Sequence, residues 1–289
     1  MIISEAIDFA TEILRKSKIE NPRHEAQILL IYVANFHKTS DTNLENSLDN
    51  NLFYTLEYIL AHPEKELNSY IAKEFTKIIN QRSKRKPLAY IVKEKEFYGR
   101  NFTVTPDVLI PRPETETLVD IAINLAKNKN CQRILEIGTG SGAIAVTLSA
   151  ELPSTQIFAS DISDKALKIA MINSAKYEKI KFIKSDLLDN ISGKFDLIIA
   201  NLPYVDRNWQ AEKNSPEILY EPEIALFADD DGTKLIKKLI KQAPKNIAEK
   251  GFLILEMDPE QMNQVSDFAN KNGFHETFRQ HYALVLEKQ

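Results

Sequence analysis

The sequence has few of the residues and patterns that mark several common classes of protein. It contains a single cysteine, Cys131, which excludes an internal disulfide framework. Cys131 stands beside an expected strand start, where a small core or edge residue is more ordinary than a nucleophile. The five histidines are scattered, without zinc-like spacing to cysteine or acidic partners, so the sequence predicts no metal site.

Long apolar runs are missing as well. No stretch approaches the roughly 20 residues that cross a membrane, so we expect no membrane association. Acidic residues at Glu5, Asp8 and Glu12 interrupt the apolar positions of the first segment, which does not resemble a signal peptide or an anchor. These features, with 43% hydrophobic residues over 289 positions, predict a soluble cytoplasmic protein with a substantial core.

An excess of basic charge is the third absence. The formal net charge is −4, which argues against a large basic surface for nucleic acid, so we expect no stable nucleic-acid complex. One basic cluster occurs where cations suit the end of a helix, and we interpret it as a solvated helix end rather than a phosphate site. Its members are Arg82, Lys84, Arg85 and Lys86.

Residues 1–86 repeat apolar positions at a spacing of three to four, which predicts a small all-helical domain. Ser4 is expected to cap the first helix, and Asn21 and Pro22 are expected to open the second. No catalytic residues are visible in this region. The domain is therefore either a structural cap or a docking module for a macromolecular partner, and its residues favour neither interpretation.

Around Pro87 the apolar period shifts toward two. Residues 94–111, EKEFYGRNFTVTPDVLIP, alternate well enough for a hairpin with its turn at residues 99–101. We interpret residues 87–110 as a hairpin linker between the helical domain and the rest of the chain. A further helix is expected to start near Pro113.

The strongest local signal is the stretch RILEIGTGSGAIAVTLSAEL. An apolar strand runs into three alternating glycines, Gly138, Gly140 and Gly142, and then into a helix, so backbone can approach a ligand closely at this junction. The spacing also satisfies the looser dinucleotide fingerprint, so an NAD-dependent enzyme is an alternative at this point. Either ligand carries ribose hydroxyls, which Asp161 at the end of the next expected strand can bind.

Glu136, two residues before the first glycine, distinguishes the two ligands. An acid followed by alternating glycines resembles the acid-x-Gly-x-Gly-x-Gly motif of class I S-adenosylmethionine-dependent methyltransferases, in which the acid helps to hold the methionine end. Two later apolar segments end at Asp186 and just before Asn201. Because the carboxyl ends of parallel strands meet one crevice, we expect Glu136, Asp161, Asp186 and Asn201 to converge there. Asp186 and Leu187 would then lie beside the adenine.

The segment Asn201-Leu202-Pro203-Tyr204 follows the apolar run FDLIIA, and we name it the acceptor corner. Pro203 ends regular structure and leaves the carbonyls of Asn201 and Leu202 free. The corner resembles the (Asn/Asp)-Pro-Pro-(Tyr/Phe) motif of methyltransferases that alkylate nitrogen on a planar sp2 system. The Asn201 amide oxygen and the Leu202 carbonyl can accept the two hydrogens of such a nitrogen, and Tyr204 can stack on the planar group. These four residues are the predicted catalytic residues.

The whole chain resembles the release factor glutamine methyltransferases, the PrmC or HemK family. The matching stretches include EFYGRNFTVTPDVLIPRPETE, LEIGTGSGAIAV, NLPYV and YEPEIALFADDDG. The resemblance implies an α/β fold: a Rossmann-like class I methyltransferase with a mostly parallel seven-stranded sheet in residues 111–289, joined by the β-hairpin to the N-terminal helical domain. It also implies that S-adenosylmethionine methylates the side-chain amide nitrogen of the glutamine in the Gly-Gly-Gln motif of class I peptide chain release factors.

The resemblance further implies which residues hold the cofactor, and that the helical domain docks the release factor. The implied cofactor residues are Arg112, Glu114, Thr115, Glu136, Gly138, Thr139, Gly140, Ser141, Gly142, Asp161, Ile162, Asp186, Leu187 and Asn201.

Departures from the family pattern leave alternatives open. Leu202 stands where the family has proline, which keeps the carbonyl acceptor but removes one ring that fixes φ. The final segment, QHYALVLEKQ, lacks the Asp and Arg usual near the family's last strand. The corner also resembles the motif of ribosomal RNA adenine dimethyltransferases, so an adenine N6 methyltransferase acting on RNA or DNA is the alternative function. A non-enzymatic binding protein is a third class, against which the intact Asn201 and glycine loop argue.

Overall fold

The structure, a computed structural model, describes residues 1–40, 54–177, 179–206 and 215–289. The chain divides into two units, Met1–Val92 and Lys93–Gln289. Among the residues described, none of the helices is both long enough and apolar enough to cross a membrane.

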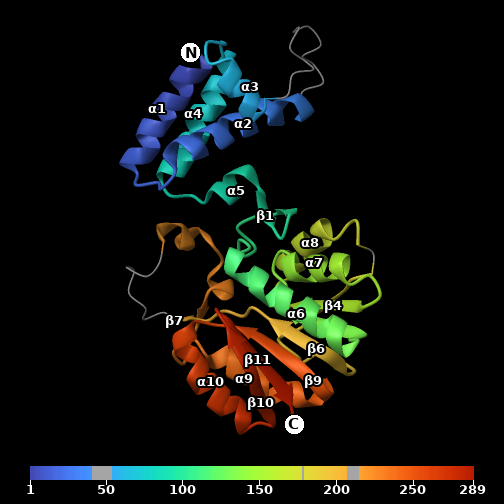
Figure 1. Ribbon diagram of the computed structural model, residues 1–289. Coiled ribbons are helices and arrows are strands. Elements are labelled where there is room, and N and C mark those ends of the chain that lie inside the picture. The colour runs from blue at the N-terminus through green and yellow to red at the C-terminus, as the bar shows by residue number, and fades with distance from the viewer. Residues whose placement is uncertain (41–53, 178, 207–214) are drawn as a thin grey trace. The chain divides into compact units, whose positions relative to one another are not determined.

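The first unit is built from helices, as its periodicity predicts, and Figure 1 shows α1, α2 and α4 packed beside one another. Its core includes Leu14, Leu30 and Phe75. The first helix begins at Ile3, so the expectation that Ser4 caps it is wrong; the Ile2 N–H instead donates to the Glu5 carboxylate at 3.0 Å. The helices are α1 (Ile3–Lys16), α2 (Pro22–Ser40), α3 (Leu56–Ala61), α4 (Ser69–Ser83) and α5 (Leu88–Val92).

The basic cluster at the end of α4 is not simply a solvated helix end. Arg82 is 6% exposed and donates to both oxygens of Glu25 on α2, at 2.5 and 3.2 Å. Arg85 donates to the carbonyls of Ser17 and Lys18, just beyond α1. The cations join three helices because tertiary packing brings a partly buried acid and the carbonyls beyond the end of α1 to them.

The hairpin forms, but its turn is one residue earlier than expected. Strands β1 (Glu94–Phe97) and β2 (Arg100–Thr103) pair antiparallel with Phe97 opposite Arg100, so Tyr98 and Gly99 make the turn, both at positive φ. Tyr98 adopts this conformation because α6 (Glu116–Lys129) anchors it: its N–H donates to Glu116 and its hydroxyl to Asp120, each at 2.8 Å. The hairpin belongs to the second unit, where Phe97 and Phe102 are buried.

The second unit is organised by a seven-stranded sheet in the order β10-β11-β9-β6-β3-β4-β5. The five strands from β9 to β5 are parallel, and β11 and β10 join antiparallel at one side, which confirms the predicted fold class. The strands are β3 (Arg133–Ile137), β4 (Gln156–Asp161), β5 (Lys181–Lys184), β6 (Phe195–Ala200), β9 (Ile247–Glu256), β10 (Phe274–Gln280) and β11 (Ala283–Lys288).

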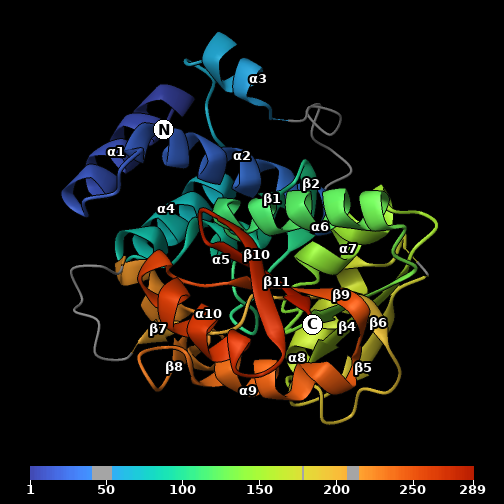
Figure 2. The same cartoon turned by 60° about the horizontal axis from the view of Figure 1, so that its bottom comes forward.

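Helices cover both faces of this sheet, as Figure 2 shows with α6 and α7 on one side and α9 and α10 on the other. Neighbouring strand residues alternate between the two cores: Ile134 packs with α6 and α7, and Leu135 packs on the opposite face. The helices are α6 (Glu116–Lys129), α7 (Ala143–Glu151), α8 (Asp164–Asn173), α9 (Lys234–Gln242) and α10 (Met262–Asn270).

The order of the parallel strands locates the crevice. The chain moves from β3 outward through β4 to β5, and then returns to β6 on the other side of β3. Ligands bind at such a switch point, outside the carboxyl ends of the strands. Two short strands, β7 (Val205–Asp206) and β8 (Phe227–Ala228), pair just beyond this edge.

Candidate active site

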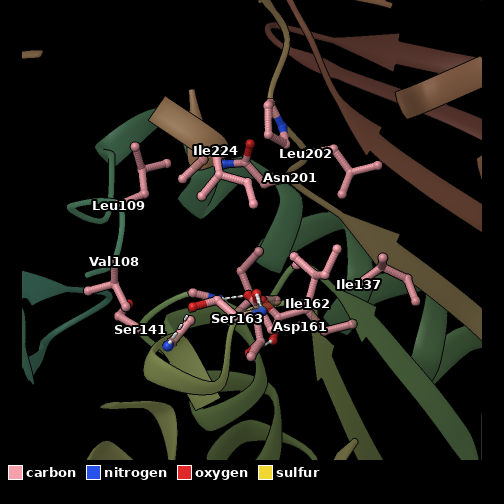
Figure 3. A pocket seen from close by; sticks show the side chains of 18 of the residues that line it. Val108, Leu109, Ile137, Ser141, Asp161, Ile162, Ser163, Asn201, Leu202 and Ile224 are labelled. Carbon is pink, nitrogen blue, oxygen red and sulfur yellow. Dashed lines mark hydrogen bonds between the residues drawn. The ribbon is translucent and has the colours of Figure 1, made fainter. Parts of the chain in front are cut away.

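A cavity of about 440 Å³ lies at the carboxyl ends of β3, β4, β5 and β6. Figure 3 shows Asn201 and Leu202 on one side of it and Asp161, Ile162 and Ser163 on the other, with Val108 and Leu109 beside the opening between them. The predicted site residues that line it are Arg112, Thr115, Glu136, Gly138, Thr139, Gly140, Ser141, Asp161, Ile162, Asp186, Leu187, Asn201, Leu202 and Pro203. Glu114, Gly142 and Tyr204, which the sequence also implicated, do not line it.

Asp161 ends β4 and organises the loops on both sides of it. Its Oδ2 accepts the Gly140 N–H at 2.9 Å, and its Oδ1 accepts the Ser163 N–H at 2.8 Å. Burial raises the pKa of the Asp161 carboxyl, and the backbone donors oppose that rise. Each oxygen keeps a further lone pair, so the carboxylate can hold the loop and still accept two ribose hydroxyls.

Glu136 is buried at the end of β3 and is bound mainly to its own loop. Its Oε2 accepts the Thr139 hydroxyl at 2.6 Å and the Ala145 N–H at 3.0 Å. Burial raises the pKa of this carboxyl to about 8, although both donors lower it. Glu136 lines the cavity, so it fits the predicted place near the methionine end, but part of its role is to tie the strand to the first turn of α7.

The glycines of the loop serve different contacts. Gly142 lies at φ +82° before α7, and a Cβ there would lie 3.1 Å from the Ala170 Cβ on α8. Close helix packing therefore requires this glycine, which explains why it does not line the cavity. A Cβ on Gly138 would come within 3.2 Å of the Leu202 side chain, whereas one on Gly140 would meet nothing within 4 Å. Gly138 and Gly140 both line the cavity, and of the three glycines Gly140 has the most open space beside it.

The end of β5 differs from the sequence expectation. The strand stops at Lys184, so Asp186 lies beyond it and forms a salt bridge of 2.7 Å with Lys238 on α9. Leu187 is buried and has a φ of +49°, which is unusual for a branched residue and typical of functional sites. Because the Asp186 carboxylate is already paired with Lys238, the backbone of Leu187 is the better candidate for a hydrogen bond with an adenine.

Asn201 directly follows β6, and its side chain is held by Thr115, the residue before α6. Its Nδ2 donates to the Thr115 hydroxyl oxygen at 3.0 Å, which leaves its Oδ1 as an acceptor for a ligand. Leu202 is buried and packs against the glycine loop. The glycine loop and the acceptor corner therefore touch each other.

Tyr204 turns away from the cavity into the protein. Its hydroxyl donates to the Glu256 Oε1 at 3.3 Å, and burial together with the Glu256 charge raises the pKa of the phenol. Its backbone is clamped, because the Gln261 Nε2 donates to the Tyr204 carbonyl at 2.8 Å and to the Asp231 carbonyl at 2.7 Å. A Cβ on Gly232 would lie 2.0 Å from the same Tyr204 carbonyl oxygen. The predicted stacking role of Tyr204 stays a prediction.

Two acids of the site were not identified from the sequence. Glu221 is buried and accepts the Ile110 N–H at 3.0 Å and the Arg112 guanidinium, so it fixes the segment that follows the hairpin at the cavity. Glu256 ends β9 beside Asn201 and is 1% exposed. Glu256 follows the same rule as the predicted residues, a polar side chain at the end of an apolar strand, so the segment FLILE contained the signal. Glu221 follows no such rule.

The cavity fits an adenosine-containing cofactor. A carboxylate stands where ribose hydroxyls need acceptors, Gly140 has room beside it, and Ile137, Ile162 and Leu187 supply apolar lining. No cluster of three or more His, Cys, Asp or Glu side chains suited to a metal ion occurs in the described parts of the chain.

Two family models match the chain. One, described as the PrmC N-terminal domain, matches residues 5–92, and the other, described as the methyltransferase small domain, matches residues 119–226. A solved methyltransferase structure from Pyrococcus furiosus has a TM-score of 0.50 at 17% identity and covers 72% of this chain and 98% of its own. This likeness supports the fold alone.

Curated relatives are closer in sequence. The release factor glutamine methyltransferase of Koribacter versatilis is 34% identical, over 89% of this chain and 86% of its own length. The bifunctional methyltransferase of Rickettsia bellii is 35% identical over 92% of this chain, but this chain spans only 51% of it.

Proposed function

We propose, because this chain belongs to the release factor glutamine methyltransferase family, that it methylates a glutamine side-chain amide nitrogen in a release factor. Family membership implies S-adenosylmethionine as the cofactor, which when bound supplies a methyl group on a positively charged sulfur. The resemblance of the motifs points to the glutamine of the Gly-Gly-Gln sequence as the acceptor.

The orientation of Asn201 carries this proposal. A glutamine amide presents two N–H donors and needs two acceptors to hold its nitrogen in place. The Asn201 nitrogen is engaged by Thr115, so Oδ1 is available to accept one hydrogen, and the Leu202 carbonyl can accept the other. Both residues line the same cavity as the Asp161 loop.

This arrangement acts by positioning. The amide lone pair is delocalised, so the nitrogen is a weak nucleophile and must be aimed along the sulfur–carbon bond that breaks as its own bond to carbon forms. Effective molarities of well-oriented groups reach roughly 10⁵ M and above, which is sufficient to account for much of such a rate enhancement. The nitrogen then loses one of its two protons, and no strong base is required because the alkylated amide is acidic.

The test is incubation of the protein with labelled S-adenosylmethionine and a class I release factor, followed by mass spectrometry. We expect one methyl group on the Gly-Gly-Gln glutamine, and none on a factor whose glutamine is replaced by alanine. Asn201→Ala should lower the rate by about 10² or more while cofactor affinity changes much less. Methylation of structured RNA instead of the factor would favour the adenine N6 methyltransferase alternative.

The N-terminal unit is proposed to dock the release factor. The match to the PrmC N-terminal domain over residues 5–92 supports this role, as do exposed apolar side chains such as Phe9 and Leu60, at 47% and 59%. Phe9→Ser and Leu60→Ser should raise KM for the factor and leave kcat and cofactor affinity unchanged. Equal KM values for both variants and the wild type would contradict docking through these residues.

We propose further that the protein forms no stable nucleic-acid complex and is cytoplasmic. The net charge of −4 supports a protein acceptor and the absence of a stable nucleic-acid complex. A release factor partner supports a cytoplasmic location without membrane association.

A further inference from the structure

Glu256 is a buried acid behind the acceptor corner, and the methyl transfer described above does not use it. In the sheet, Leu255 on β9 pairs with Ala200 on β6, so Glu256 comes level with Asn201. Its Oε1 accepts the Tyr204 hydroxyl, whereas its Oε2 has no hydrogen-bond partner at good geometry. A buried polar atom without a partner is costly, so the position of this acid calls for a reason beyond packing.

Thr115 connects this acid to the corner. Burial raises the pKa of the Glu256 carboxyl, and the polar groups of Thr115, Tyr204 and Asn201 oppose that rise, so all three lie close to the acid. Thr115 accepts the Asn201 Nδ2 hydrogen through its hydroxyl oxygen, at 3.0 Å. A hydroxyl that accepts from one side can donate its own hydrogen to the other side, and an ionised carboxylate can only accept. A Thr115 hydroxyl that turns its hydrogen toward Glu256 would therefore extend the contact from Asn201 to this acid.

We propose that Glu256, as a carboxylate, is a positioning residue that sets which end of the Asn201 amide faces the acceptor, acting through the Thr115 hydroxyl. This inference rests on the proposed function. With Glu256 ionised, the Asn201 nitrogen is turned to Thr115 and Oδ1 faces the cavity. With Glu256 protonated, its hydroxyl can donate to Thr115, Thr115 can donate to Oδ1, and the Asn201 nitrogen then faces the N–H groups of the acceptor.

The surroundings of Glu256 set the pH range over which it changes its protonation state. Burial raises the pKa of the carboxyl to about 7, and the nearby charge of Glu114 adds to the rise. Two phenols are the other titratable groups nearby: Tyr204, which donates to Glu256, and Tyr282, which acts electrostatically on Tyr204. Because the carboxylate is the productive form, kcat should rise as the pH increases through about 7.

The first experiment compares kcat of the full-length protein toward a release factor across pH 5.5–8.5. Glu256→Gln should lower kcat about tenfold or more at pH 8 and keep the cofactor dissociation constant within about threefold. The rise of kcat near pH 7 should be absent from its pH profile. Thr115→Val should have the same effect, and the double variant should be no worse than either single one, since the residues act in series. Thr115→Ser keeps the hydroxyl and should retain activity within about threefold. A wild-type kcat in Glu256→Gln, or losses that multiply in the double variant, would overturn the inference.

The second experiment does not depend on turnover. In protein labelled with ¹⁵N-asparagine, the Asn201 side-chain resonance, identified by its loss in Asn201→Ala, should titrate near pH 7 in the wild type and not in Glu256→Gln. If the wild type methylates no release factor and this titration is still present, the proposed function fails, whereas the control of the Asn201 orientation by Glu256 stands. Absence of the titration in the wild type overturns the inference, and this measurement decides even where Glu256→Gln fails to fold.

Discussion

The two sides of the cavity are held in different ways. On the cofactor side, the hydrogen bonds of Glu136 join it to residues three and nine positions away, and those of Asp161 join it to residues two and 21 positions away. On the acceptor side, Asn201 is held by a residue 86 positions away, and Tyr204 by residues 52 and 57 positions away. The cofactor side is one strand–loop–helix unit with its neighbouring strand, whereas the acceptor corner is assembled from distant elements.

This difference implies that the two binding events are separable. Cofactor binding should depend on a few neighbouring backbone groups and should survive changes elsewhere. Acceptor positioning should fail when any of several remote contacts is lost, because a misplacement of about 1 Å can cost a factor of roughly 10² in rate. Three substitutions test this separation, and a fourth tests the burial of Glu136 on the cofactor side.

The largest effect is expected for Gly232→Ala. An added Cβ would lie 2.0 Å from the Tyr204 carbonyl oxygen and 2.4 Å from the Gln261 Nε2, so the acceptor corner must move. We expect methylation to fall by about 10² while the affinity for S-adenosylmethionine, measured by calorimetry, stays within about threefold. Gly273→Ala is the matched control, because Gly273 has a similar φ of +83° against +80° and nothing within 4 Å of the new Cβ. Equal activity of the two variants would remove the special role of this contact.

Asp161→Asn should produce the converse result. The loss of a charged acceptor should weaken cofactor binding by about 1.5 to 3 kcal/mol, or roughly 10- to 150-fold, as measured by calorimetry. Asp196→Asn is the control, because Asp196 also accepts two backbone N–H groups, at 2.7 and 2.9 Å, but at the amino end of β3. If both variants lower cofactor affinity equally, the effect comes from general destabilisation.

Glu136→Gln should change how stability depends on pH. The pKa of Glu136 is about 8 in the folded protein, above its ordinary value of 4.5, so the folded state binds the extra proton between these pH values. The wild type should therefore lose stability as the pH rises from 4.5 to 8, by at most about 1.4 kcal/mol for each pH unit from this group. The melting temperature of Glu136→Gln should fall less steeply than that of the wild type over this pH range. Parallel curves of melting temperature against pH would show that Glu136 titrates normally.

The smallest effect is expected for Lys238→Ala. Its salt bridge with Asp186 is about half exposed on both sides, at 41% and 45%, and such pairs contribute about 0.2 to 1 kcal/mol. Cofactor affinity should change by less than about fivefold in calorimetry, because we expect the Leu187 backbone rather than the Asp186 carboxylate to read the adenine. Lys184→Ala, which breaks an exposed pair with Asp164, is the control. A much larger loss in Lys238→Ala alone would assign Lys238 a direct contact with the ligand.

Sequence reasoning was most successful where partners are close along the chain. The second helix starts at Pro22 as expected, because the fixed φ of proline suits a first helical turn whatever the tertiary contacts are. It was less successful for Arg82 and for the hairpin turn. Arg82 is buried against Glu25, and Tyr98 is drawn into the turn by Glu116, so both outcomes depend on residues brought in by packing.

The sequence by itself determined the architecture of the second unit and the edge of its sheet at which the site lies. Apolar runs that each end in a polar residue bring those residues together once the strands are parallel, since all carboxyl ends meet one edge. Only the tertiary structure decided that Gly142 serves helix packing, that Tyr204 turns toward Glu256 and that the Asn201 nitrogen is turned to Thr115. The physical reason is that the direction of a side chain follows from hydrogen-bond partners, and here those partners come from elements far apart in the sequence.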